Sequence, residues 1–188
     1  MKKVATCFGG AMNISDSPAY LDSVDIGAWL ADNEYVIKTG GYGGMMEAFS
    51  KGASQAQGHV IGCTCESFGV NSKPNQYIAE ERKSKNLYGR LKRLIEEDGP
   101  CYRVFICQVG GAGTFTELFI CLDLFRKMKS PPPIYLVGAH YEGIIDAVKP
   151  YMNTKEHALT TIVTTKENLY QKIKEDESRH WAAQRKQD

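Results

Sequence analysis

The chain lacks long apolar runs and has almost no excess charge. No stretch of its 188 residues approaches the roughly 20 apolar residues that a membrane-spanning helix needs. Its formal net charge is only +1, so composition gives no reason to expect a surface for nucleic acid or membranes. Met1-Lys2-Lys3 leads directly into an apolar segment rather than a signal peptide. We therefore expect a cytoplasmic protein that binds neither nucleic acid nor membranes.

Motifs of common metal and nucleotide sites are also missing. The six cysteines have no histidine or cysteine partners at zinc-binding spacing. Most of them lie in predicted strands or in an apolar helix, where cysteine behaves as a small apolar residue. Neither G-x-G-x-x-G nor G-x-x-x-x-G-K occurs. We predict no metal and no cofactor, and any nucleotide site must be built in another way.

Short apolar segments alternate with segments of helical periodicity along nearly the whole chain. The expected strands are residues 3–7, 35–38, 60–63, 104–107, 134–137 and 160–164. The expected helices are residues 18–33, 45–57 (ending at Gly58), 86–97, the segment that leads into 118–125, 141–151 and 166–178. This alternation predicts an α/β protein in which helices cover both faces of a parallel sheet. We expect one domain over residues 1–188, with residues 179–188 as a frayed tail.

Two glycine turns follow the first two predicted strands. Gly9-Gly10 is equally well a tight strand exit or part of a binding site. Gly40, Gly41, Gly43 and Gly44 lose conformational entropy on folding, a cost best explained if the backbone closely approaches a ligand. The methionines that follow suit the core, and we include Met45 as one that touches a flat ligand. Ligands bind parallel sheets at the carboxyl ends of strands, so these turns and a third can line one crevice.

The third turn, Gly110-Gly111-Ala112-Gly113-Thr114-Phe115-Thr116-Glu117, is the most informative stretch. It lies between an apolar strand and an apolar helix. Such a turn aims free N–H groups and the positive end of a helix at one point, which favours a phosphate or carboxylate. Thr114 can cap the helix, bind a phosphate, or do both. Glu117, about one turn into the helix, is either a catalytic acid or a charge that only complements the helix dipole.

This third turn resembles the P-G-G-x-G-T-x-x-E signature of the LOG ("Lonely Guy") family. These proteins are cytokinin-activating nucleotide phosphoribohydrolases, long mislabelled as lysine decarboxylases. The segment from Thr39 to Ala48 resembles the second family signature, and the strand at Val4 with its Gly9-Gly10 exit also fits. The similarity covers roughly residues 2–150. It implies a Rossmann-like, doubly wound parallel sheet in three α/β/α layers and a homodimer.

The resemblance also implies a reaction, the hydrolysis of the N-glycosidic bond of a nucleoside 5′-monophosphate. The substrate would be AMP-like or of cytokinin type, and the products a free base and ribose 5-phosphate. Gly110, Gly111, Gly113 and Thr114 would hold the 5′-phosphate, and Glu117 would contact the ribose and stabilise an oxocarbenium-like transition state. A family arginine on the preceding helix would complete the site, either Arg90, which we favour, or Arg82.

Three features set the chain apart from the family pattern. Val109 replaces the family's proline, the arginine has two candidates, and residues 99–103 lengthen a helix-to-strand loop. A divergent branch of this fold includes molybdenum-cofactor carrier proteins, so a non-catalytic nucleotide or cofactor carrier is the alternative. A pyridoxal-dependent decarboxylase is rejected, since nothing marks a Schiff-base lysine with a partner for the ring nitrogen.

The helix over residues 118–125 is apolar nearly all round, so it must be buried on more than one side. Either a central helix or a dimer interface satisfies this pattern, and the resemblance favours the dimer. The base preference of the site cannot be read from the sequence.

Overall fold

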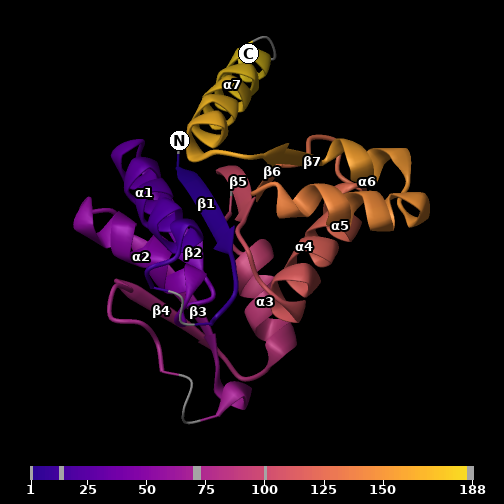
Figure 1. Ribbon diagram of the computed structural model, residues 1–188. Helices are drawn as coiled ribbons and strands as arrows, with labels where there is room; N and C mark the ends of the chain where they lie inside the picture. Colours follow the sequence, from indigo (N-terminus) through magenta and orange to yellow (C-terminus); the bar gives the residue numbers. More distant parts are fainter. Residues whose placement is uncertain (1, 13–14, 70–72, 100, 186–188) are drawn as a thin grey trace.

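All strands of the described chain join one parallel sheet. The computed structural model describes residues 2–12, 15–69, 73–99 and 101–185. Its strands are β1 (Lys3–Phe8), β2 (Tyr35–Thr39), β3 (Val60–Cys65), β4 (Glu80–Ser84), β5 (Tyr102–Cys107), β6 (Ile134–Val137) and β7 (Thr160–Val163). Their order is β4-β3-β2-β1-β5-β6-β7 (Figure 1). Strands β2, β3 and β4 thus follow one another on one side of β1, and β5, β6 and β7 follow one another on its other side.

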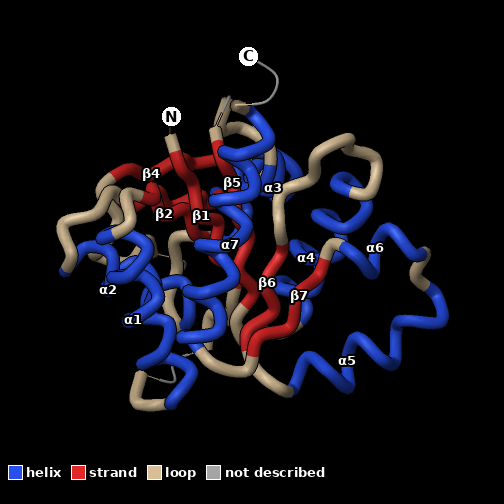
Figure 2. The backbone as a smooth tube through the Cα atoms, turned by 90° about the horizontal axis from the view of Figure 1, so that it is seen from above, coloured by secondary structure: helices blue, strands red, loops and turns tan. Residues whose placement is uncertain are grey.

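Helices cover both faces of this sheet (Figure 2). The helical elements are α1 (Pro18–Asp32), α2 (Met45–Gln55), η1 (Glu66–Phe68), α3 (Leu87–Ile95), α4 (Ala112–Phe125), α5 (His140–Val148), η2 (Lys149–Tyr151), α6 (Thr154–Ala158) and α7 (Lys166–Gln184). Side chains of α1, α2 and α7 share one core with the sheet, and those of α3, α4 and α5 share the other. The predicted α/β class, the parallel sheet and its three layers are therefore confirmed.

Alternation along the strands divides the residues between the two cores. On β5, Val104 and Ile106 face the α1–α2–α7 layer, whereas Phe105 and Cys107 face the α3–α4 layer. All four side chains are fully buried, as expected for a central parallel strand. All six cysteines are free thiols and five of them are buried, in agreement with their apolar role.

Side-chain caps fix where several helices begin. Ser17 accepts a hydrogen bond from the N–H of Tyr20 at 3.2 Å, and Pro18 occupies the first position of α1. Asn86 accepts one from the N–H of Gly89 at 2.9 Å and so starts α3. No helix of the described residues is long and apolar enough to cross a membrane.

Strand β4 was not predicted from the sequence. Its residues, Glu-Glu-Arg-Lys-Ser, show no apolar pattern because this edge strand leaves most of its side chains at least partly exposed. Arg82 therefore lies on β4, and the expectation that it lies on a helix is wrong.

Several element ends also differ from the prediction. α7 continues to Gln184, so the expected tail is helical up to that residue, while residues 186–188 lie outside the described part. α2 ends at Gln55, and the residue with positive φ after it is Gln57 rather than Gly58. The loop expected over residues 99–103 is shorter, because β5 already begins at Tyr102.

Two tyrosines beneath α7 allow a matched test of hydrogen bonding. The Tyr135 hydroxyl donates to Asp176 Oδ2 at 2.5 Å, whereas the buried Tyr102 hydroxyl has no hydrogen-bond partner among the described residues. Tyr135→Phe should lower the free energy of unfolding by about 1.5–3 kcal/mol, because it removes a hydrogen bond to a charged group. Tyr102→Phe should leave it unchanged or raise it slightly. Urea unfolding of both variants measures the difference, and equal losses would contradict this reading.

Candidate functional site

Gly10 ties the three glycine turns together. Its N–H donates to the carbonyl of Val109 at 3.0 Å, and its own carbonyl accepts from the N–H of Met45 at 2.9 Å. Gly44 has φ +65°, and a Cβ there would lie 2.3 Å from the Gly10 oxygen. Only glycine tolerates both constraints. The turns after β1, β2 and β5 therefore meet at one place, and the predicted crevice at the carboxyl edge of the sheet is confirmed.

A cavity of about 750 Å³ opens at this meeting point. A volume of this size suits a small organic ligand. Of the residues nominated from the sequence, eight line it: Gly9, Gly10, Gly43, Arg90, Gly111, Gly113, Thr114 and Glu117. The cavity therefore brings residues of all three turns to a glutamate and an arginine from two different helices.

Arg90 and Glu117 form a buried ion pair in this cavity. Arg90 Nη1 lies 3.0 Å from Glu117 Oε1, and the two residues are only 5% and 7% exposed. Arg90 Nε also donates to the carbonyl of Cys63 at 2.8 Å, which anchors the guanidinium to β3. A charge-assisted bond of this kind is strong and directional, so the carboxylate is held in one place.

Burial sets the protonation chemistry of Glu117. Desolvation raises the pKa of its carboxyl, and the neighbouring charge and hydrogen bond of Arg90 oppose that rise. Glu117 is the sixth residue of α4, beyond the first turn of the helix. Its place in the chain is therefore poorly explained by the helix dipole, which acts mainly within the first turn.

The amino end of α4 faces the same cavity. Gly111 stands at the cap position and makes no side-chain cap bond, and Gly113 and Thr114 in the first turn also line the cavity. The first N–H groups of a helix have no partner within it, and they carry the positive end of its dipole. This end of α4 is therefore suited to an anionic group placed beside Glu117.

An aromatic wall closes one side of the cavity. The rings of Tyr42 and Phe68 lie 5.7 Å apart between centroids, and the Arg90 guanidinium carbon lies 5.8 Å and 5.5 Å from those centroids. The Tyr42 hydroxyl accepts from the N–H of Cys65 at 2.8 Å, which fixes this ring against β3. The wall presents flat apolar surface beside two charged groups.

The remaining nominated residues lie behind this surface. Gly40 packs against Arg90, and a Cβ there would lie 2.0 Å from Nη2. Gly41, Gly44 and Gly110 belong to the turns but are not among the described residues that line the cavity. Met45 is fully buried in the core, and its neighbour Met46 lines the cavity instead.

The structure separates the two candidate arginines. Arg82 lies on β4, where its Nε donates to Glu80 Oε1 at 2.6 Å, and it is not among the described residues that line the cavity. Arg90 shares the face of α3 that carries Leu87, Leu91 and Leu94, so helical periodicity alone points it inward.

Sequence reasoning did not nominate other residues that line the cavity. They are Ala11, Met12, Tyr42, Met46, Phe68, Lys73, Leu87, Leu91 and Thr116. Tyr42 lies inside the second glycine turn, and that position could have marked it. Phe68 ends the single-turn η1, and neither Phe68 nor Lys73 carries a periodic signal in the sequence. Among the described residues, no group of three or more histidine, cysteine, aspartate or glutamate side chains could hold a metal ion.

Gly113 offers a test of the proposed anion site that leaves the fold intact. A Cβ added there meets no atom within 4 Å, and alanine favours a helix over glycine by about 1 kcal/mol. Gly113→Ala should therefore unfold at equal or higher temperature but bind AMP or phosphate more weakly, because the methyl group occupies space beside the end of α4. Calorimetry of unfolding and binding measures both effects. Unchanged affinity would place the anion elsewhere.

Removing Arg90 should make stability depend on the ionisation of Glu117. In Arg90→Met the pKa of Glu117 rises further above its unfolded value, so the stabilisation present at low pH is lost as pH rises through the folded pKa. Breaking a buried pair costs about 3–5 kcal/mol, and we expect that loss near pH 8 and a smaller one near pH 5. Urea unfolding across this range measures it.

The double variant Arg90→Met/Glu117→Gln is the matched control, since it carries no ionisable group at either position. Its free energy of unfolding should lack the extra loss that Arg90→Met shows between pH 5 and pH 8. A loss of the same size in the double variant would assign the effect to another group.

Comparisons with known proteins agree with this geometry. A family model described as "Possible lysine decarboxylase" matches residues 46–173, and a second, "SLOG cluster4 family", matches residues 2–78. No curated protein matches the chain.

Solved structures share the fold at low sequence identity. The molybdenum cofactor binding protein from the phototrophic bacterium Rippkaea orientalis is 20% identical, with a TM-score of 0.72 over 93% of this chain and 97% of that one. The molybdenum cofactor carrier protein from Chlamydomonas reinhardtii is 17% identical, with a TM-score of 0.72 over 93% and 98%. DNA processing protein A from Helicobacter pylori is 14% identical, with a TM-score of 0.61 over 93% and 81%.

The first family model covers more than half of the chain and includes Glu117 and its glycine turn. The resemblance to the LOG group is thereby confirmed, and the protein belongs to the family described as possible lysine decarboxylases.

Proposed function

We propose that the protein is a phosphoribohydrolase that cleaves the N-glycosidic bond of a nucleoside 5′-monophosphate. The observation that carries this proposal is the buried Arg90–Glu117 pair beside the amino end of α4, in one cavity. The pair supplies a carboxylate for a developing positive charge, and the helix end supplies a place for a phosphate. Membership of the LOG group supports the same reaction.

The phosphate would be bound by the backbone at the end of α4. The N–H groups around Gly111 and Gly113 would donate to its oxygens, and the Thr114 hydroxyl would add a further donor. Thr116 also lines the cavity beside them. Holding the phosphate at this end would bring the ribose of the nucleotide toward Glu117.

Glu117 would act on the ribose and on water. As the bond between C1′ and the base nitrogen breaks, positive charge develops on the sugar, and a carboxylate fixed by Arg90 stabilises it. A carboxyl whose pKa is raised by burial is also a stronger base toward the attacking water. The water oxygen bonds to C1′, and its released proton balances the charge on the departing base. The products are a free base and ribose 5-phosphate.

The aromatic wall suits the base of the same nucleotide. The rings of Tyr42 and Phe68, with the methionine side chain of Met46, would provide a surface on which a flat purine can stack. An AMP-like nucleotide, or one with an apolar group on its base, fits this lining better than a small pyrimidine.

A nucleotide or cofactor carrier is the second candidate, and its support is about equal. The fold is shared with proteins described as binding or carrying the molybdenum cofactor. A carrier would use the same end of α4 for a phosphate but would not release a base. It would also retain its ligand through purification.

The homodimer remains a prediction, and α4 offers a surface for it. Phe119 is 40% exposed, and Phe115, Ile120 and Leu124 beside it are only partly buried. Phe115 and Phe119 share a shallow apolar depression with Thr116, which also lines the candidate site. A second copy seated there would lie next to the cavity.

Incubation with nucleoside 5′-monophosphates tests the reaction directly, with free base measured by chromatography. The wild-type protein should release base from AMP or a related purine nucleotide. Glu117→Gln should bind the nucleotide with similar affinity and lose at least about 100-fold in turnover, as is typical when a general base is removed. Glu97→Gln, just beyond the far end of α3, is the matched control and should retain full turnover.

If the protein is a carrier, the same experiment should give the opposite result. No base would be released by the wild-type protein from any nucleotide of the panel, and mass spectrometry of the denatured protein would find a retained organic ligand. Base release that persists in Glu117→Gln would reject the assigned role of that carboxylate.

A further inference from the structure

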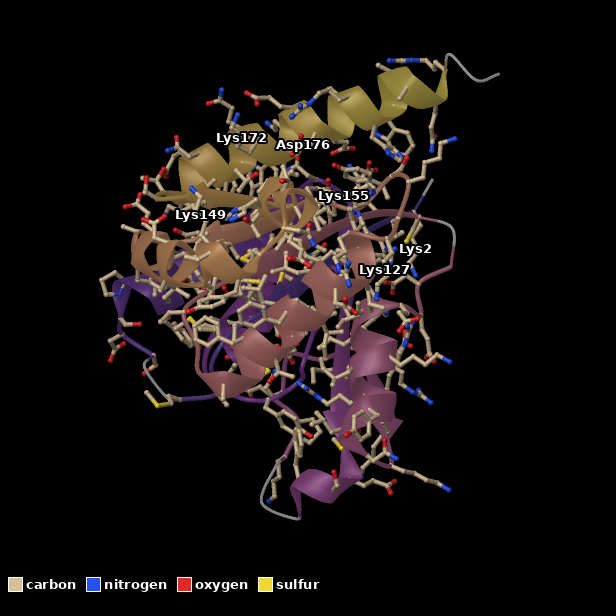
Figure 3. The ribbon with its side chains drawn as sticks, turned by 90° about the vertical axis from the view of Figure 1, so that its right-hand side faces the viewer. Lys2, Lys127, Lys149, Lys155, Lys172 and Asp176 are labelled. Carbon is tan, nitrogen blue, oxygen red and sulfur yellow. The ribbon has the colours of Figure 1, made fainter. Side chains whose placement is uncertain are left out.

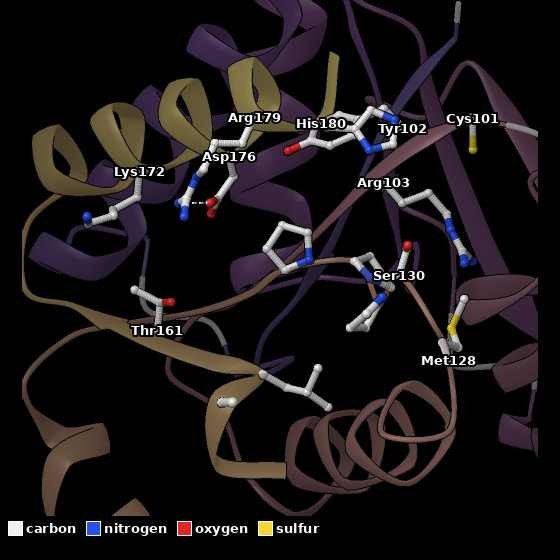
Figure 4. A pocket seen from close by; sticks show the side chains of 15 residues that line it. Cys101, Tyr102, Arg103, Met128, Ser130, Thr161, Lys172, Asp176, Arg179 and His180 are labelled. Atoms are coloured by element: carbon white, nitrogen blue, oxygen red, sulfur yellow. Dashed lines mark hydrogen bonds and ion pairs between the residues drawn. The ribbon is translucent and has the colours of Figure 1, made fainter. Parts of the chain in front are cut away.

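A second cavity lies at the opposite edge of the sheet from the candidate site. It has a volume of about 740 Å³ and is lined by residues at the amino ends of β5, β6 and β7 and on α7 (Figure 4). Because the strands are parallel, their amino ends lie on the edge away from the three glycine turns. The two cavities share no lining residue.

Positive groups exceed negative ones in this cavity. Arg103, Lys172 and Arg179 line it, against one carboxylate, that of Asp176. Asp176 is already engaged, since it pairs with Arg179 and accepts the Tyr135 hydroxyl at 2.5 Å. Lys127, Lys149, Lys155 and Lys172 all lie on the side of the molecule seen in Figure 3. An anion that enters the cavity would therefore meet an excess of positive charge.

The cations differ in how firmly they are held. Arg103 Nη1 donates to the carbonyl of Ile95 at 2.9 Å, and its guanidinium lies 5.9 Å from the ring centroids of Phe105 and Phe125. Lys172 pairs with Glu175 in an exposed contact of 2.9 Å, which contributes little and is easily exchanged. Arg103 thus offers a fixed cation, while Lys172 and Arg179 on α7 lie in exposed pairs with Glu175 and Asp176 that a phosphate can exchange with.

The rest of the lining is largely apolar and rigid. Pro131, Pro132 and Pro133 run along the cavity with Leu159 and Ala158, and Ser130 and Thr161 add two hydroxyl groups. Proline has a fixed φ and no N–H donor, so this wall presents flat apolar surface without backbone donors. Figure 4 shows Arg103 and Lys172 at opposite ends of the cavity. A ligand with a flat body and anionic groups matches this arrangement.

We propose that this amino-edge cavity binds a small organic phosphate, separately from the candidate site and independently of its function. Lys172 and Arg179, both on α7, would contact the phosphate oxygens, the proline wall would cover the apolar body, and Arg103 would lie at the far end of the cavity. Arginine and lysine are the side chains best suited to phosphate.

Trp181 reports on this cavity. Its ring lies 5.9 Å from that of Tyr102 and 4.8 Å from that of His180, and both of those residues line the cavity. The only other tryptophan, Trp29, stacks on Tyr170 at 4.4 Å. Trp29→Phe therefore leaves a single reporter beside the cavity. Adding Glu117→Gln prevents turnover of the nucleotide at the other edge.

Titration of this protein with AMP and with inorganic pyrophosphate, followed by Trp181 fluorescence, tests the proposal. We expect saturable binding that is tighter for AMP, since pyrophosphate lacks the apolar body. Lys172→Gln/Arg179→Gln should weaken it at least about tenfold, the loss expected for two charge-assisted contacts. Lys127→Gln, an exposed lysine that does not line the cavity, should change the affinity less than about twofold.

Three results would overturn the proposal: no saturable change with either compound, equal affinity in the Lys172→Gln/Arg179→Gln variant, or pyrophosphate binding as tightly as AMP. If Gly113→Ala removes the fluorescence change and Lys172→Gln/Arg179→Gln does not, the signal would come from binding at the candidate site instead. Circular dichroism of each variant checks that α7 remains folded.

Discussion

The contact on which the site depends is the pairing of backbone groups at Gly10. The backbone of this one residue accepts from α2 and donates to the turn after β5, so three segments far apart in sequence are held within hydrogen-bond distance. This pairing is available because β1 lies where the strand order reverses, with β2 on one side and β5 on the other. A side chain at Gly10, Gly44 or Gly110 would crowd the neighbouring turns, and these glycines are therefore structural.

Helix α3 carries the second constraint. Arg90 reaches across to Glu117 and to the carbonyl of Cys63. Toward the other end of the helix, the fully buried Lys38 of β2 donates to the carbonyl of Arg93 at 3.0 Å and pairs with Asp98 at 2.6 Å. One buried ion pair thus joins α3 to α4, and the other joins β2 to the segment just after α3. Because each charge needs its partner to remain buried, any shift of α3 is opposed at both ends.

Sequence reasoning found the elements whose signals are local. The apolar strands, the three glycine turns and the place of Glu117 after the third turn are all readable from neighbouring residues. Strand β4 was missed because an edge strand needs no apolar residues, and that omission left Arg82 as a rival to Arg90. Phe68 reaches the cavity from η1, a single helical turn after β3, and local periodicity cannot reveal that.

Strand β4 also bears on how the protein behaves at high concentration. The edge of a sheet presents unpaired backbone groups that can recruit the edge of another molecule. On β4 the acidic Glu80 and Glu81 and the basic Arg82 and Lys83 line that edge, with Glu80 paired to both Arg82 and His59. Charged side chains along a short strand make strand addition from a neighbouring molecule costly. The segment that was hardest to recognise in the sequence thus protects the sheet from aggregation.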